Sequence, residues 1–160
     1  FHAPLIIMAV ALVSACGPEL ATEMDAPEET ATARSVIPEM IDGLRPEVSP
    51  VEAPAHIQDA VSADYGGGKY TVRIVKGRDV TASFDYSRRE GRRFFASMSN
   101  KRTFSRDQYD PYWEIVASDD EDGHWVAWTN DRWMFFLGAT DAAGLDRLIG
   151  LFPYIEASEE

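Results

Sequence analysis

Residues 124–138 read HWVAWTNDRWMFFLG and are the strongest β-hairpin signal in the chain. Two apolar runs flank Asn130-Asp131, and Asn and Asp tolerate the positive φ that a two-residue hairpin turn demands. Alternation along the runs predicts one face with Trp125, Ala127, Trp133 and Phe135, and the other with Val126, Trp128, Met134 and Phe136. One face is expected to meet a helix, and the other is either covered by residues 36–64 or exposed as a binding patch.

Upstream of this hairpin, alternation of apolar and polar residues predicts further antiparallel strands. The predicted strands are 69–75, 80–86, 93–98 and 112–117, separated by turns at 76–78 and 87–91, with an acidic turn at 119–123 before the hairpin. Residues 56–64 have apolar positions at helical spacing and predict a short helix. Residues 100–111 read NKRTFSRDQYDP and predict an irregular, basic loop.

Downstream of the hairpin, the sequence predicts an amphipathic helix. Thr140 is the expected N-cap, and Pro153 ends the pattern. The apolar positions recur at i, i+3, i+4 and i+7, at Leu145, Leu148, Ile149 and Phe152. The predicted fold class is therefore α+β: an antiparallel β-meander of five or six strands over residues 55–160, with this C-terminal helix packed on one face.

A second signal lies at the N-terminal end, where residues 5–15 carry no charge. The run is too short to span a bilayer, which takes roughly 20 apolar residues, but it fits the apolar region of a signal peptide. It leads into Val13-Ser14-Ala15-Cys16, which resembles the lipobox of bacterial lipoproteins. The alternative interpretation is a buried helix that carries one core cysteine.

The resemblance implies that residues 1–15 are a signal peptide, cut before Cys16, and that the Cys16 thiol carries a diacylglyceryl group. Acyl chains such as palmitate would then anchor the protein in the bacterial cell envelope. Gly17 stands where inner-membrane lipoproteins of enteric bacteria tend to have Asp, so the resemblance favours the outer membrane, facing the periplasm.

Residues 16–54 are rich in Pro, Glu, Ala and Thr and contain no aromatic residue. Such a composition buries too little apolar surface to offset the entropy of ordering the chain. We therefore expect a lipid-anchored acidic tether, disordered over residues 18–34. Residues 36–44 are expected either to form a short helical turn that docks on the domain or to act as a linear motif for a partner.

The charge is unevenly distributed in a chain of net charge -12. Residues 69–108 contain 11 basic residues against four acids, so this segment either pairs with the acidic ends or attracts an anionic partner. Arginine suits carboxylate and phosphate groups, and aromatic residues beside it are typical of interfaces. The candidate partner-binding residues are Arg88, Arg89, Arg92, Arg93, Phe95, Arg102, Trp128 and Phe136. Because export is expected, the partner is a protein or an anionic envelope component rather than nucleic acid.

Other motifs fail on spacing. Gly66-Gly67-Gly68-Lys69 lacks the Ser or Thr and the helix that follow a phosphate-binding loop. The acidic turn lacks carboxylates at the first and twelfth positions of a calcium loop, Ser118 and Thr129. We predict no metal, no cofactor and no catalysis, but a binding or assembly role in the envelope. The alternatives are an immunity or inhibitor lipoprotein that caps an enzyme or toxin, and a hydrolase with an unrecognised site.

Overall fold

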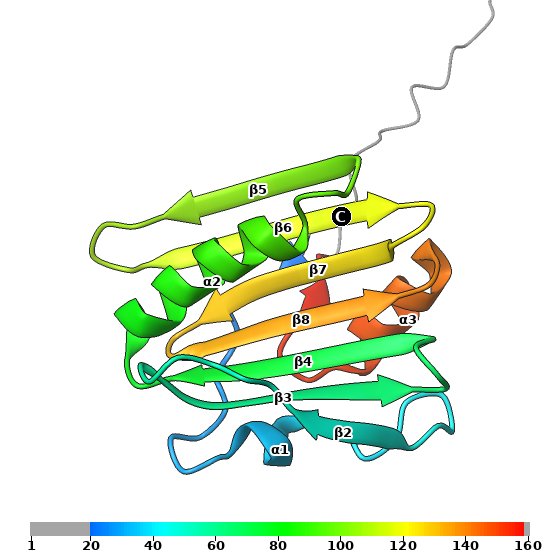
Figure 1. Ribbon diagram of the computed structural model, residues 1–160, viewed down its shortest axis with the longest axis horizontal. Coiled ribbons are helices and arrows are strands. Elements are labelled where there is room, and N and C mark those ends of the chain that lie inside the picture. The colour runs from blue at the N-terminus through cyan, green and yellow to red at the C-terminus, as the bar shows by residue number, and fades with distance from the viewer. Residues whose placement is uncertain (1–19, 159–160) are drawn as a thin grey trace, which may run out of the picture.

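The 124–138 hairpin lies inside a seven-stranded antiparallel sheet, in a computed structural model that describes residues 20–158 (Figure 1). The strand order is β2-β3-β4-β8-β7-β6-β5. The strands are β2 (Pro46–Pro50), β3 (Ile57–Tyr65), β4 (Tyr70–Gly77), β5 (Asn100–Arg106), β6 (Tyr112–Asp119), β7 (Gly123–Asn130) and β8 (Trp133–Ala139). The predicted α+β class with a C-terminal helix is confirmed, and the sheet has slightly more strands than expected.

The hairpin turn differs from the predicted one by a single residue. Asn130 pairs with Trp133, so the two turn residues are Asp131, with φ of 52°, and Arg132. Residues paired across a hairpin share a face, and Trp128 therefore lies on the same face as Trp133. The predicted grouping of the two strands was wrong on this point, although the alternation within each strand holds.

The prediction of two strands, over 80–86 and 93–98 with a turn between them, is wrong. These residues form the helix α2 (Val80–Phe94) and the turn that follows it. Asp79 caps the helix by accepting a hydrogen bond from the Ala82 backbone N–H at 2.8 Å. The buried positions Ser83, Ser87 and Gly91 recur every four residues, which is a helical period. Three of the five buried residues of α2 are small, so its apolar period is weak, and the two large ones, Phe84 and Tyr86, fit the alternation of a strand as well.

Two further predictions are corrected in the outer strands of the sheet. The helix predicted over residues 56–64 is absent, because residues 57–65 form β3, which pairs with β2 and with β4 and has a register shift between Ile57 and Asp59. Residues 100–106, predicted as part of a loop, form the edge strand β5, whose side chains are almost all exposed. An edge strand needs only one hydrogen-bonded neighbour and commonly carries Lys and Arg, so it lacks the apolar alternation of an inner strand.

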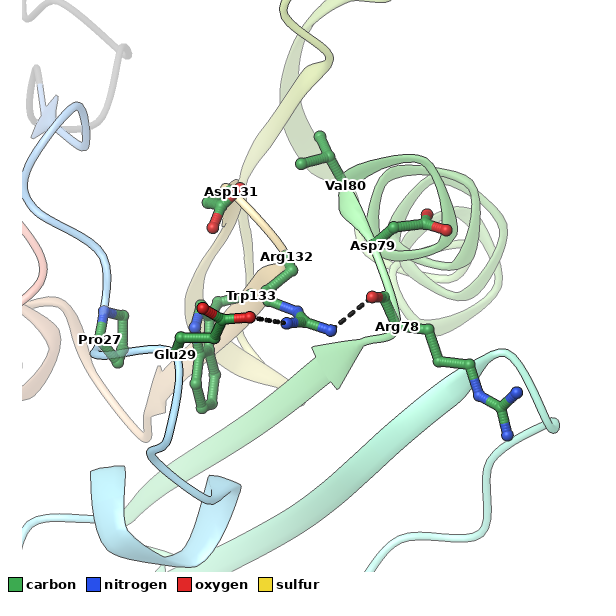
Figure 2. Close-up of a pocket in the computed structure, with 8 residues that line it drawn as sticks. All are labelled: Pro27, Glu29, Arg78, Asp79, Val80, Asp131, Arg132 and Trp133. Atoms are coloured by element: carbon green, nitrogen blue, oxygen red, sulfur yellow. Dashed lines mark hydrogen bonds and ion pairs between the residues drawn. The ribbon is translucent and has the colours of Figure 1, made fainter.

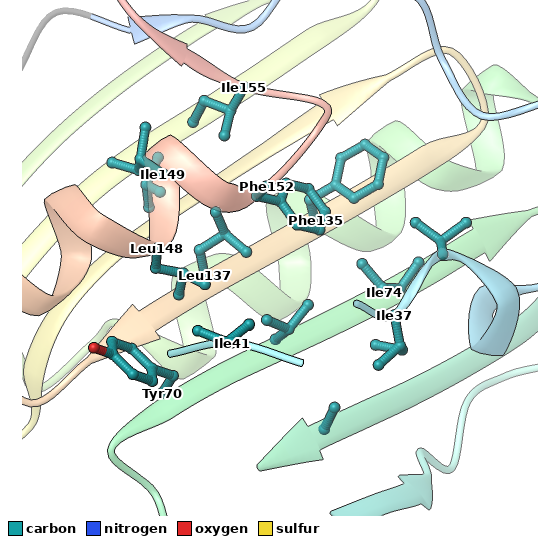
Figure 3. Packing of buried hydrophobic residues seen from close by; sticks show 14 of the residues in the cluster. Ile37, Ile41, Tyr70, Ile74, Phe135, Leu137, Leu148, Ile149, Phe152 and Ile155 are labelled. Atoms are coloured by element: carbon teal, nitrogen blue, oxygen red, sulfur yellow. The ribbon is translucent and has the colours of Figure 1, made fainter. Parts of the chain in front are cut away.

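The helix α3 (Ala142–Leu151) covers one face of the sheet. Asp141, rather than the predicted Thr140, is its N-cap. The four predicted apolar positions are buried as expected, at Leu145, Leu148, Ile149 and Phe152. Figure 3 shows three of them packed against β8 and β4, with Ile37 and Ile41 on the same side.

The other face of the sheet is covered mainly by α2, and of the predicted covering segment 36–64 Val51 and Ala53 pack against the same cluster. The core therefore has two layers, one between the sheet and α2 and the other between the sheet and α3. Both faces of the 124–138 hairpin are buried, which leaves no exposed binding patch on it.

Residues 20–34 belong to the folded unit rather than to the spacer predicted over 18–34. The strand β1 (Leu20–Ala21) pairs with β9 (Glu156–Ala157), and the helix α1 (Ala33–Val36) packs on the α3 side. We call the connecting residues 22–32 the strap. Side chains of the sheet hold the strap through its backbone carbonyls. The Asn130 side-chain amide, for example, donates to the Met24 carbonyl at 2.7 Å.

Lys76 makes two of these attachments. Its side chain is 3% exposed, and its ammonium donates to the carbonyls of Glu29 at 2.6 Å and Ala31 at 2.7 Å. The same ammonium lies 5.0 Å from the ring centroid of Trp133. A buried charge is tolerated where it is hydrogen-bonded and paired, and here two carbonyls and the face of the Trp133 ring supply these contacts. Lys76 in β4 thereby helps to order the strap, although the composition of the strap predicts disorder.

The predicted signal peptide (residues 1–15) and Cys16 lie outside the described residues. Among residues 20–158, no helix combines the length and the hydropathy needed to cross a bilayer.

Candidate partner-binding surface

The helix α2 gathers four of the eight predicted partner-binding residues. It lies close to the sheet because Gly91 faces the indole of Trp113: a Cβ at position 91 would lie 2.2 Å from that ring. The stripe of small residues turns inward, and the arginines project from the remaining sides of the helix. They are Arg88, Arg89, Arg92 and Arg93, and all but the half-buried Arg88 are exposed.

The four arginines differ in what they contact. The guanidinium of Arg88 lies over the Phe84 ring, 5.3 Å from its centroid. Arg89 lies 5.7 Å from the Tyr86 ring centroid and 3.4 Å from a Glu90 carboxylate oxygen. Within residues 20–158, the guanidinium groups of Arg92 and Arg93 make no ion pair and no hydrogen bond. Two cations at the end of α2 thus retain their full hydrogen-bonding capacity.

The charge pattern of α2 has opposing effects on helix stability. Arg88 and Arg92, and likewise Arg89 and Arg93, are like charges at i and i+4, which cost about 0.2–0.5 kcal/mol per pair. Arg92 and Arg93 also lie in the last turn, where the helix dipole favours cations by about 0.3–1 kcal/mol each. The dipole accounts for the last two arginines, but not for four cations in two turns.

An exposed aromatic ring, that of Phe94, adjoins these arginines. The residue expected in this role from the sequence is the next one, Phe95. Phe94 is 37% exposed and packs edge-on against Trp125 with ring centroids 5.0 Å apart. Phe95, the predicted residue, is 1% exposed and stacks on Phe136 inside the core. The signal for this difference is the helical period, because Phe95 follows Gly91 by four residues and so continues the inward stripe.

The remaining predicted residues lie elsewhere. Phe136 is 1% exposed in the core under α2, and Trp128 is fully buried in the core under α3. Arg102 is exposed on β5 opposite Val116, which faces away from α2. The structure thus brings the four α2 arginines together with Phe94, leaves Arg102 on the other face, and places three predicted aromatic residues in the core.

A pocket of about 380 Å³ opens beside the strap, lined in part by Glu29, Arg78, Arg132 and Trp133 (Figure 2). Its charged groups are engaged in holding the fold. Arg132 donates to the carbonyls of Gly77, at 3.1 Å, and Arg78, and lies 3.6 Å from the Glu29 carboxylate. The Arg78 guanidinium points away from the pocket (Figure 2). These contacts tie the strap to the sheet and do not converge on a ligand.

Two acidic sites are also structural. Tyr70 and Arg147 each donate to Asp42 at 2.8 Å, and these hydrogen bonds hold the pKa of the Asp42 carboxyl below its usual value. In the predicted acidic turn, the Glu121 backbone N–H and the Ser99 hydroxyl donate to Asp119, which lowers the pKa of that carboxyl. Among the described residues 20–158, no three metal-ligating side chains form a cluster.

Comparisons with protein-family models, with curated proteins and with solved structures find no protein similar to this chain.

Proposed function

We propose that this chain is a lipid-anchored protein of the bacterial cell envelope that binds an acidic partner through α2, without catalysis. The binding surface, which we call the arginine surface, consists of Arg88, Arg89, Arg92, Arg93 and Phe94. The observation that carries the proposal is the pair Arg92 and Arg93, which have no acidic partner among residues 20–158, beside an exposed ring at the end of the same helix.

The chemistry of the arginine surface suits an acidic protein. Guanidinium groups bind carboxylates through paired, charge-assisted hydrogen bonds, which are stronger than those between neutral groups. Contact with a carboxylate would also relieve the repulsion between the like charges at i and i+4. Phe94 supplies apolar area, and an aromatic residue next to arginine is the composition enriched at interface hot spots.

The anchor rests on Val13-Ser14-Ala15-Cys16 and the uncharged run before it. Each buried methylene of an acyl chain contributes about 0.8 kcal/mol to membrane binding, and two or more chains hold a protein stably on a bilayer. Gly17 after the cysteine favours the outer membrane, with the domain in the periplasm.

The anchor is tested with the full chain behind a complete signal sequence, compared with Cys16→Ser. We expect a lipid-sized gain in intact mass and partitioning into the detergent phase, both lost in Cys16→Ser. Equal masses and equal solubility of the two proteins would contradict the anchor.

The arginine surface is tested by site-specific photo-crosslinking in cells. A photoreactive phenylalanine analogue at Phe94 should yield a discrete crosslinked product, whereas the same analogue at Met40, an exposed apolar residue near α1, should not. The product should disappear in Arg92→Gln/Arg93→Gln and persist in the matched variant Arg34→Gln/Arg45→Gln, which removes two exposed cations outside α2. A product that is unaffected by the first double variant would refute the role of the arginines.

A further inference from the structure

The first described strand, β1, fixes where the chain enters the fold. Leu20 and Ala21 pair with β9, and Leu20 packs against the core on the α3 side of the sheet. The Thr22 hydroxyl, next along the chain, is hydrogen-bonded to the Tyr112 hydroxyl in β6. The entry point is therefore attached to the face of the sheet that lies opposite α2 (Figure 1).

Only three residues separate Leu20 from Cys16. Because a fully extended chain spans at most about 3.6 Å per residue, Cys16 cannot lie more than roughly 14 Å from Leu20. A disordered tether over residues 16–54 would instead hold the anchor at a root-mean-square distance of roughly 35 Å. The packed strap removes that freedom and keeps the entry point next to any lipid on Cys16.

The surface around the entry point exposes two large apolar side chains. Phe104 in β5 is 55% exposed, and Leu151 at the end of α3 is 52% exposed. Ala21 lies between them: it lines one hollow of about 320 Å³ together with Phe104, and another of about 660 Å³ together with Leu151. Exposed apolar groups that cluster in this way are typical of surfaces that contact proteins or membranes.

The charges at this surface are mainly acidic. Arg106 lies 2.8 Å from the Glu23 carboxylate and 2.9 Å from that of Asp110, so its charge is more than compensated, and Glu114 and Glu156 line the same hollows. Contact with lipid would therefore depend on the apolar side chains, and it would be enforced by the short connection to the anchor. The apolar rings and chains of such a surface enter the boundary between headgroups and acyl chains.

From these observations we infer that the surface formed by Ala21, Phe104 and Leu151 lies against the lipid bilayer. We call it the membrane-facing surface. The inference rests on the proposed lipidation of Cys16 and adds an orientation to it. Because α2 covers the other face of the sheet, this orientation turns the arginine surface away from the bilayer and toward partners in the periplasm.

The test uses the full lipidated protein with one cysteine added at a time: Phe104→Cys, Leu151→Cys or Phe94→Cys. All three positions are exposed, and Phe94 is the matched control on the opposite face. The sulfur of a lipidated Cys16 is a thioether and does not react with maleimide, so an environment-sensitive fluorophore labels only the added cysteine. The labelled proteins are placed on phosphatidylethanolamine–phosphatidylglycerol vesicles, with or without headgroup-nitroxide lipid as a quencher.

We expect the nitroxide to quench most of the fluorescence at positions 104 and 151 and little of it at position 94. Vesicle flotation of each protein reports separately on the anchor, and circular dichroism checks that each variant is folded. Flotation with equal quenching at the three positions, or with stronger quenching at position 94, would overturn the orientation and leave the anchor intact. Failure of the wild-type protein to float would overturn the anchor and the orientation together.

Discussion

Gly91 in α2 and Gly150 in α3 should respond in opposite directions to the same substitution by alanine. A Cβ at position 91 would lie 2.2 Å from Cη2 and 2.5 Å from Cζ2 of Trp113, whose side chain is 2% exposed. Carbon atoms approach to about 3.5 Å, so the helix and the indole must separate by about 1.3 Å. At position 150 no atom lies within 4 Å of the added Cβ.

The magnitudes follow from these two environments. Alanine is favoured over glycine inside a helix by about 1 kcal/mol, whereas forcing extra volume into a packed core costs about 1–3 kcal/mol and occasionally more. Since the Gly91 contact involves a rigid ring held between α2 and the sheet, we expect Gly91→Ala to lower the free energy of unfolding by about 1–2 kcal/mol net. Gly150→Ala should raise it by about 0.5–1 kcal/mol.

Urea unfolding followed by tryptophan fluorescence and by circular dichroism measures both variants against the wild-type protein. Equal midpoints from the two probes would justify comparison of the free energies. If Gly91→Ala stabilises the protein as Gly150→Ala does, the close packing of α2 on β6 is refuted, and with it the placement of the arginine surface.

Two further predictions concern the α3 side of the sheet. Lys76→Met removes the donor to the Glu29 and Ala31 carbonyls, and the loss of a hydrogen bond to a charged group costs about 1.5–3 kcal/mol. Hydrogen exchange of the strap should therefore accelerate in Lys76→Met. It should not accelerate in Lys101→Met, whose ammonium donates to the exposed Ala96 carbonyl. Burial raises the pKa of Tyr65 from 10.0 to about 12, so its contribution to stability is complete below pH 10 and is lost as the pH rises to about 12. Burial also raises the pKa values of Tyr112 and Tyr86, so the protein as a whole loses more stability than Tyr65 alone contributes. Urea unfolding across this range should show a loss in Tyr65→Phe that is smaller than in the wild-type protein by up to about 2 kcal/mol, whereas Tyr109→Phe should lose as much as the wild-type protein. Losses of equal size in Tyr65→Phe and in the wild-type protein would contradict the assignment.

The hairpin and the C-terminal helix could be predicted from the sequence because each is defined by a contiguous apolar period. Leu145, Leu148, Ile149 and Phe152 repeat at helical spacing and are all buried. Residues 80–94 could not be predicted in this way, because Val80, Ala82, Phe84 and Tyr86 fit a strand. The inward side of the actual helix adds Ser83, Ser87 and Gly91 to Phe84 and Tyr86, and three small residues give it a weak apolar period. Small residues carry little hydrophobic signal, but they allow the closest approach of a helix to a sheet.

The candidate site was predicted in part for the same reason. The cluster of arginines is visible in the sequence, but only the helix separates the exposed Phe94 from the buried Phe95 and places Arg102 on the opposite face. The Val13–Cys16 motif is a local pattern, so its prediction needs no tertiary structure.

The sequence by itself determined the α+β class, the central hairpin and the amphipathic α3, because short-range periodicity encodes which side of a segment is apolar. Only the tertiary structure decided what covers each face, which residues form the edges, and that residues 20–34 are ordered. Those outcomes depend on partners distant in the chain: Lys76 holds carbonyls more than 40 residues away, and Trp113 accommodates the helix at Gly91. Such contacts have no local period, so they emerge only when the chain has folded.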